Sequence, residues 1–108
     1  MPEISPRQLH DTAATFGLLA APVRLQILWL LGKHEQDVGT LAEATGQSLA
    51  TVSHHLGKLK LAGLVRAQRR GKHQVYVATD SHVLAVIRLA LDEGARSAVD
   101  ERALSVGA

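Results

Sequence analysis

Residues 37–63 read DVGTLAEATGQSLATVSHHLGKLKLAG, and this stretch predicts two helices joined by a tight turn. Asp37 and Ser48 are residue types that cap a helix N-terminus, while Gly46 and Gly63 supply the positive φ angle at which helices commonly end. Between Ser48 and Gly63, apolar residues recur at i, i+4 and i+7, the pattern of a helix with one buried face. The stretch therefore predicts a helix, a turn and a helix.

Two further helices precede this helix-turn-helix, which we place at about residues 38–62. Residues 7–20 carry apolar side chains at helical spacing, and Pro22 can open a second helix at its first turn. That second helix, over residues 22–32, has an aliphatic face and adds the large apolar surface of Trp29. We expect it to be the central helix of the core.

The apolar pattern changes to a period of two over residues 64–79, which we predict to be a β-hairpin. Its two β-rich runs are joined around Gly71 and Lys72, a pair that suits a two-residue hairpin turn. Basic residues cluster at this turn, so the tip of the hairpin carries positive charge.

The last predicted helix is apolar over residues 83–91 except for Arg88. So little of its surface suits water that it needs cover on two sides, and one domain of this size covers only one of them. We therefore expect a homodimer formed by residues 8–20 and 81–96, with Ile87 in the interface.

The predicted fold class is mainly α with a β-hairpin: about five helices, including the helix-turn-helix, in one domain, residues 1–108. The chain has no cysteine, which excludes disulfides, thiolate metal sites and cysteine nucleophiles. No segment approaches the roughly 18 apolar residues of a membrane span, and the N-terminus lacks a basic region followed by an apolar one. We expect a cytoplasmic protein with no membrane partner.

Charge is distributed unevenly along the chain. Residues 47–79 hold six of the 12 Lys and Arg residues and none of the 10 Asp and Glu residues. An exposed basic face is the ordinary explanation of a charge run, but 33 consecutive residues without an acid, inside a folded segment, favour a polyanionic partner. Nucleic acid is the leading candidate for that partner.

Four segments resemble the ArsR/SmtB family of repressors: AAPVRLQIL (20–28), LAEATG (41–46), TVSHHL (51–56) and AGLV (62–65). They occur in the family's order and at its spacing, over about residues 9–91, which makes the resemblance more specific than any single motif. It implies a dimeric winged helix-turn-helix, with the β-hairpin of residues 64–79 as the wing, that binds operator DNA and represses transcription.

The helical wheel of the second helix in the motif predicts which side chains face DNA. At about 100° per residue, several residues project away from the apolar stripe, while Leu49 lies close to the buried side and His55 is expected to pack as a partly buried imidazole. The predicted contacts in and before this helix are Ser48, Ala50, Thr51, Ser53, His54 and Lys58. Those of the hairpin are Arg69, Arg70, Lys72 and His73, on phosphates or in the minor groove. Ordinary solvated surface is the alternative at each position.

A sensor site is the second functional feature that the resemblance suggests. The Cys-x-Cys pair of some relatives is absent, but Asp80 and His82 match half of the Asp-x-His site that others carry on the last helix. Its second half is altered here to Glu93 and Arg96, and a guanidinium cannot be a ligand. Because eleven helical residues rise about 16 Å, His82 could share an ion only with Glu93 of the partner subunit. Such a set suits nickel or cobalt better than zinc; an ordinary helix N-cap is the alternative.

The sequence leaves one alternative to a metal-responsive repressor and argues against an enzyme. A metal-independent regulator, controlled by a partner protein or an organic ligand, would keep DNA binding without a sensor site. An enzyme is not expected, since Ser53 and His54 are adjacent on a helix and point about 100° apart, which does not allow a nucleophile and base to meet.

Overall fold

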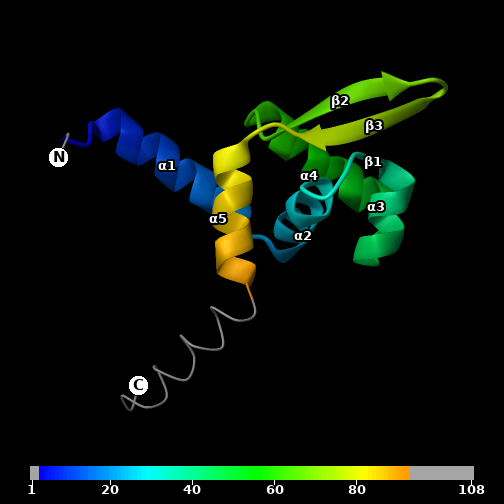
Figure 1. The fold of residues 1–108 in the computed structure, drawn as a ribbon, viewed down its shortest axis with the longest axis horizontal. Coiled ribbons are helices and arrows are strands. Elements are labelled where there is room, and N and C mark those ends of the chain that lie inside the picture. Colours follow the sequence, from blue (N-terminus) through cyan, green and yellow to red (C-terminus); the bar gives the residue numbers. More distant parts are fainter. Residues whose placement is uncertain (1–2, 93–108) are drawn as a thin grey trace, which may run out of the picture.

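The computed structural model describes residues 3–92 (Figure 1). Within them the chain forms five helices and three strands, in an order that confirms the predicted winged helix-turn-helix. The elements are α1 (Pro6–Leu19), α2 (Pro22–Leu31), β1 (Gln36–Asp37), α3 (Val38–Thr45), α4 (Leu49–Leu61), β2 (Val65–Arg70), β3 (His73–Ala78) and α5 (Ser81–Leu91).

The ends of α3 and α4 follow from the predicted capping residues. The Asp37 carboxylate accepts a hydrogen bond from the Thr40 amide at 2.7 Å, and the Ser48 hydroxyl accepts one from the Thr51 amide at 3.1 Å. Gly46 ends α3 with a φ of 70°, a left-handed conformation that costs glycine little. These local interactions separate α3 from α4 and fix the turn between them.

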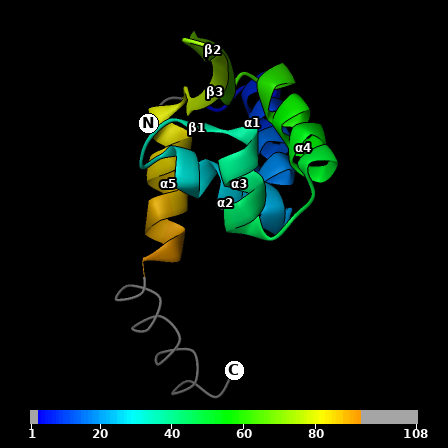
Figure 2. The ribbon, with the colours of Figure 1, turned by 90° about the vertical axis from the view of Figure 1, so that its right-hand side faces the viewer.

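The core forms around α2, as expected. Ile27, Leu28 and Leu31 of α2 are buried, and α2 lies between α4 and α5 (Figure 2). The remaining buried apolar side chains come from every other helix, from β2 and from the residue just before β2; they are Leu19, Leu41, Ala42, Val52, Leu56, Leu59, Leu64, Val65, Val83 and Ile87. Burial of these aliphatic groups, at about 1.5–3 kcal/mol for each larger side chain, is the main stabilising contribution to the domain.

Two expectations about burial are wrong. Ile87 is only 1% exposed and belongs to the protomer's own core, so it does not lie in an interface. Leu49 is 59% exposed rather than close to the buried side; it is the first residue of α4. His55 is half-buried, as expected.

The hairpin is part of a three-stranded antiparallel sheet with the order β1-β3-β2. Its two-residue turn is as predicted, with Gly71 at a φ of 60°. Strand β1 was not predicted: it has two residues and pairs Gln36 with Tyr76. The buried Gln36 side chain donates to the Leu30 carbonyl at 2.9 Å, which attaches the base of the wing to the C-terminal end of α2.

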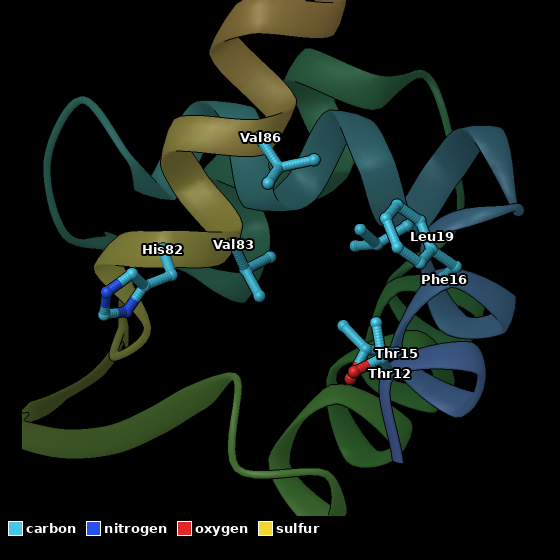
Figure 3. A pocket seen from close by; sticks show the side chains of 7 residues that line it. All are labelled: Thr12, Thr15, Phe16, Leu19, His82, Val83 and Val86. Carbon is cyan, nitrogen blue, oxygen red and sulfur yellow. The ribbon is translucent and has the colours of Figure 1, made fainter. Parts of the chain in front are cut away.

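Helices α1 and α5 form the end of the molecule opposite the wing tip (Figure 1). Their exposed apolar side chains are Leu9, Phe16, Val86, Leu89 and Leu91. An apolar groove of about 280 Å³ separates the two helices, and the side chains of Val83 and Val86 point across it toward α1 (Figure 3).

Among residues 3–92, no single helix is long and apolar enough to cross a membrane. Helices α1 and α2 reach the required length and composition only when taken together, and they are bent by 94° at the break between them.

Candidate DNA-binding surface

The N-terminal turn of α4 is organised by Ser48 and Thr51. Besides accepting the Thr51 amide, the Ser48 hydroxyl donates to the Thr51 hydroxyl at 2.9 Å. The Ser48 proton is therefore committed within the turn, whereas the Thr51 hydroxyl keeps its own proton for another acceptor. Because the first backbone N–H groups of a helix have no intrahelical partner, this end of α4 is suited to an anion such as a phosphate.

The exposed face of α4 is an open groove of about 800 Å³. It is lined by Ser53, His54, Gly57, Lys58, Lys60 and Leu61. A Cβ at Gly57 would meet nothing within 4 Å, so the centre of this face is hollow because the residue has no side chain. Hydroxyl, imidazole and ammonium groups therefore surround an open surface wide enough for a partner to approach the helix backbone.

His54 and His55 are neighbours with different environments. Their rings meet edge to face, with centroids 5.6 Å apart, but His54 is exposed and His55 is half-buried. Burial lowers the pKa of His55, and the nearby charge of Arg24 lowers it further. His55 is therefore neutral at pH 7, and Arg24 Nη1 can donate to its Nδ1, 3.2 Å away.

The wing presents two classes of basic residue. Arg69, Lys72 and His73 are exposed around the turn. Arg70 is also exposed, but its Nε lies 3.0 Å and 3.1 Å from the two carboxylate oxygens of Glu35. Both Nη groups of Arg70 are left free of this contact, so the pairing orients its guanidinium without using all of its donors.

Glu35 is a residue of the site that sequence reasoning missed. It lies just before β1, accepts a second hydrogen bond from Gln68 Nε2 at 3.0 Å, and has its pKa lowered chiefly by the hydrogen bond from Arg70. It is the acid that compensates part of the positive charge of the wing. Glu35 lies outside the acid-free segment and 35 residues from Arg70, so the sequence carried no local indication of the pair.

Asp80 and His82 lie together at the start of α5. Asp80 Oδ1 accepts the amides of His82 and Val83 at 3.0 Å and 3.1 Å, which is the N-cap arrangement, and lies 3.9 Å from His82 Nδ1. The His82 side chain is 99% exposed and is one of the residues that line the groove between α1 and α5 (Figure 3). Glu93 lies outside the described residues. Within residues 3–92, no three His, Asp or Glu side chains are grouped as metal ligands.

Comparison with known proteins places this chain in a family. The family model described as "Bacterial regulatory protein, arsR family" matches residues 21–67. The HTH-type transcriptional repressor SmtB of Mycobacterium tuberculosis is 32% identical over 91% of this chain and 73% of its own length. The chain belongs to the ArsR family. Another member from the same organism, the HTH-type transcriptional regulator KmtR, is 40% identical over 67% of this chain, and this chain spans 55% of its length.

A solved winged helix-turn-helix structure has the same fold. The homodimeric winged helix-turn-helix DNA-binding domain (fragment 1–100) of Mb0332 from Mycobacterium bovis superposes with a TM-score of 0.72 at 36% identity. The match covers 94% of this chain and 93% of that domain. The ArsR fold therefore extends over α1 and α5 as well as over the helix-turn-helix.

Proposed function

We propose that this ArsR-family chain is a dimeric transcriptional repressor that binds operator DNA with α4 in the major groove. One observation carries the proposal: the open polar groove of α4 and the basic wing both lie within residues 47–79, a segment of 33 residues that contains no acid. A helix that presents polar side chains beside a basic hairpin is the arrangement by which winged helix-turn-helix domains meet a duplex.

Each contact is assigned by its chemistry. Thr51, Ser53 and His54 are assigned to base edges, and Ala50 to an apolar contact such as one with a thymine methyl group. Lys58 holds a phosphate through its ammonium group, and Ser48, at the start of α4, holds one through its backbone N–H, since its hydroxyl proton is already used within the turn. In the wing, Arg69, Arg70, Lys72 and His73 contact the flanking backbone or the minor groove.

The dimer is assigned to residues 8–20 and 81–96. Within the described part of these ranges, Leu9, Phe16 and Leu89 expose large apolar side chains to water, a surface that a second protomer would cover. The homodimeric state of Mb0332, which has the same fold, supports a dimer. A two-fold dimer would require two half-sites about one helical turn of DNA apart, or a multiple of it.

The experiment that tests this function is a salt titration of duplex binding. We expect fluorescence anisotropy of the full chain on a labelled duplex, selected from a random pool, to give an affinity that falls linearly in log–log form with salt. The slope should correspond to several phosphate contacts. Absence of any salt-dependent binding, by a chain shown to be dimeric and folded, would contradict the proposal.

For control of DNA binding, we propose a divalent transition metal, with nickel ahead of cobalt and zinc. Asp80 and His82 supply an oxygen and a nitrogen donor at one end of α5, and Glu93 of the partner subunit would complete the set. Asp80 Oδ1 already accepts hydrogen bonds as the helix cap, which leaves Oδ2 for a metal. Asp80 and His82 are therefore half of the proposed ligand set, and the other half lies outside the described residues.

The metal test compares two exposed histidines. Nickel should change the protein concentration at which half of the labelled duplex is bound, measured by anisotropy, for the wild-type chain and for His34→Ala. It should leave this midpoint unchanged for His82→Ala. Equal behaviour with nickel and with EDTA would overturn the metal proposal. It would favour the alternative, a regulator controlled by a partner protein or an organic ligand.

A further inference from the structure

The guanidinium of Arg24 connects three helices. From its position on α2, Arg24 Nε donates to the Leu18 carbonyl of α1 at 2.7 Å, and its Nη1 faces His55 Nδ1 of α4 at 3.2 Å. Both contacts are partly buried, so water competes with them less than with the surface ion pairs of this chain. One planar guanidinium therefore links α1, whose exposed large side chains are apolar, to α4, whose exposed face is polar.

The α1 contact satisfies a helix end. Leu18 lies in the last turn of α1, where carbonyl groups have no intrahelical partner, and the last turn of α1 contains no basic residue of its own. Arg24 supplies the missing donor and a positive charge at the negative end of the helix dipole. This hydrogen bond spans the 94° bend between α1 and α2, so replacing Arg24 would remove a charged contact that holds the two helices at this angle.

The α4 contact defines the state of His55. Arg24 has only donors, so Nδ1 of His55 must be the acceptor and the neutral ring carries its proton on Nε2. His55 in turn meets the exposed ring of His54 edge to face. Arg24 is therefore one residue removed from a side chain assigned to base contact, without itself lying on the exposed face of α4.

We propose that Arg24 and His55 are positioning residues that fix the orientation of α4 relative to α1, and thereby set DNA affinity from inside the domain. This inference rests on the proposed function. It makes the contact a link between the helix assigned to dimer formation and the helix assigned to DNA. Neither residue is assigned a contact with the duplex.

A matched pair of substitutions tests the His55 half of the link. In His55→Asn, the Asn Oδ1 lies near the position of the imidazole Nδ1 and can accept from Arg24, whereas Phe in His55→Phe fills the site without an acceptor. We expect His55→Phe to weaken duplex binding roughly tenfold, the lower range for losing a hydrogen bond to a charged group, and His55→Asn to retain most of the affinity. Phe is apolar and suits a half-buried site, so the melting temperature of His55→Phe should stay close to that of the wild type while its DNA affinity falls.

Arg24→Lys tests the other half. The ammonium keeps the charge but not the planar group that reaches two acceptors in different directions. We expect this variant to remain a folded dimer by circular dichroism and sedimentation, and to bind the selected duplex roughly tenfold more weakly. Combined with His55→Phe it should cause little further loss, because both substitutions break the same link.

The pH dependence supplies an independent readout. Protonation of His55 would place a cation against Arg24 of α2, beside His54 and Lys58 of α4, which are the groups that face it. Because the pKa of His55 is lowered, its protonation begins at a pH below the ordinary histidine value of about 6.5. In that range the wild-type chain should lose affinity relative to His55→Asn. All other titratable residues are the same in both proteins, so the difference between the two curves isolates His55.

The outcomes separate this inference from the proposed function. If the wild-type chain shows no salt-dependent duplex binding, the proposed function fails. If the wild type binds, and His55→Phe and Arg24→Lys bind as folded dimers with unchanged affinity, the positioning role is overturned. The same conclusion holds if His55→Asn is as weak as His55→Phe, or if the pH curves of wild type and His55→Asn coincide.

Discussion

The two ends of this small domain expose opposite chemistry. At one end, α4 and the wing present hydroxyl, imidazole and cationic groups around an open groove. At the other, α1 and α5 present Phe16, Val86 and Leu89 to water. The helices of both surfaces pack on the same central helix, α2. One small core can therefore hold a surface suited to a polyanion and a surface suited to a second protomer at separate ends.

The largest expected effect comes from placing the same charge at each end. Leu89 of α5 and Leu61 of α4 are both leucines on helix surfaces, 71% and 92% exposed. Leu89→Glu should raise the dimer dissociation constant more than about a hundredfold, because each protomer would bury an unpaired carboxylate. Leu61→Glu should leave the dimer intact and weaken DNA binding. Sedimentation equilibrium measures the first effect, and a dimeric Leu89→Glu would place the interface elsewhere.

The next effect concerns sequence discrimination on α4. Replacing Ser53 or His54 by Ala should reduce the preference for the selected duplex over a scrambled one by about 1–3 kcal/mol, the worth of a good set of base contacts. Competition anisotropy with the two duplexes measures this ratio. Lys60→Ala, on the rim of the same groove, is the control and should weaken both duplexes alike. An unchanged ratio in both Ala variants would move base contact away from these residues.

A smaller effect should distinguish the two arginines of the wing. Arg69→Ala should lower the log–log salt slope by about one for each phosphate contact removed. Arg70→Ala should lower it less, since Glu35 already pairs with that guanidinium. Glu35→Gln should raise affinity for scrambled duplex by removing the compensating acid. Equal slopes for the two arginine variants would show that the Glu35 contact does not persist on DNA.

The smallest effect uses two helical glycines, one at each end. A Cβ at Gly57 of α4 or at Gly17 of α1 would meet nothing within 4 Å. Each change to Ala should therefore stabilise the fold by up to about 1 kcal/mol, measured by urea unfolding. Only Gly57→Ala should alter DNA affinity, because its methyl group enters the groove of α4. A loss of stability at either site would indicate a close neighbour that the free protomer does not have.

Features set by neighbouring residues could be predicted, and those set by packing could not. Asp37, Gly46 and Ser48 act within four residues of their own helices, so the ends of α3 and α4 followed from sequence. Helix α5 is apolar on nearly every side, and its pattern could not tell that Ile87 faces the core while Leu89 faces water. Strand β1, with two residues, has no period to detect.

The candidate site divides in the same way. The exposed face of α4 was predictable because one apolar stripe fixes the opposite face of a helix. The contacts of Arg70 with Glu35 and of Arg24 with His55 join residues 35 and 31 positions apart, and depend on how the wing and α2 pack. Sequence pattern gave the charged and polar residues of the site, and tertiary structure gave their partners.

The most direct test of the division between the two ends is hydrogen exchange of the full dimeric chain, with and without its selected duplex. DNA should slow exchange in Leu49–Leu61 and around the turn of the wing, and leave the amides of Ser81–Leu91 close to their free rates. Protection by DNA confined to Ser81–Leu91, with none in Leu49–Leu61, would contradict the assignment of α4 to DNA.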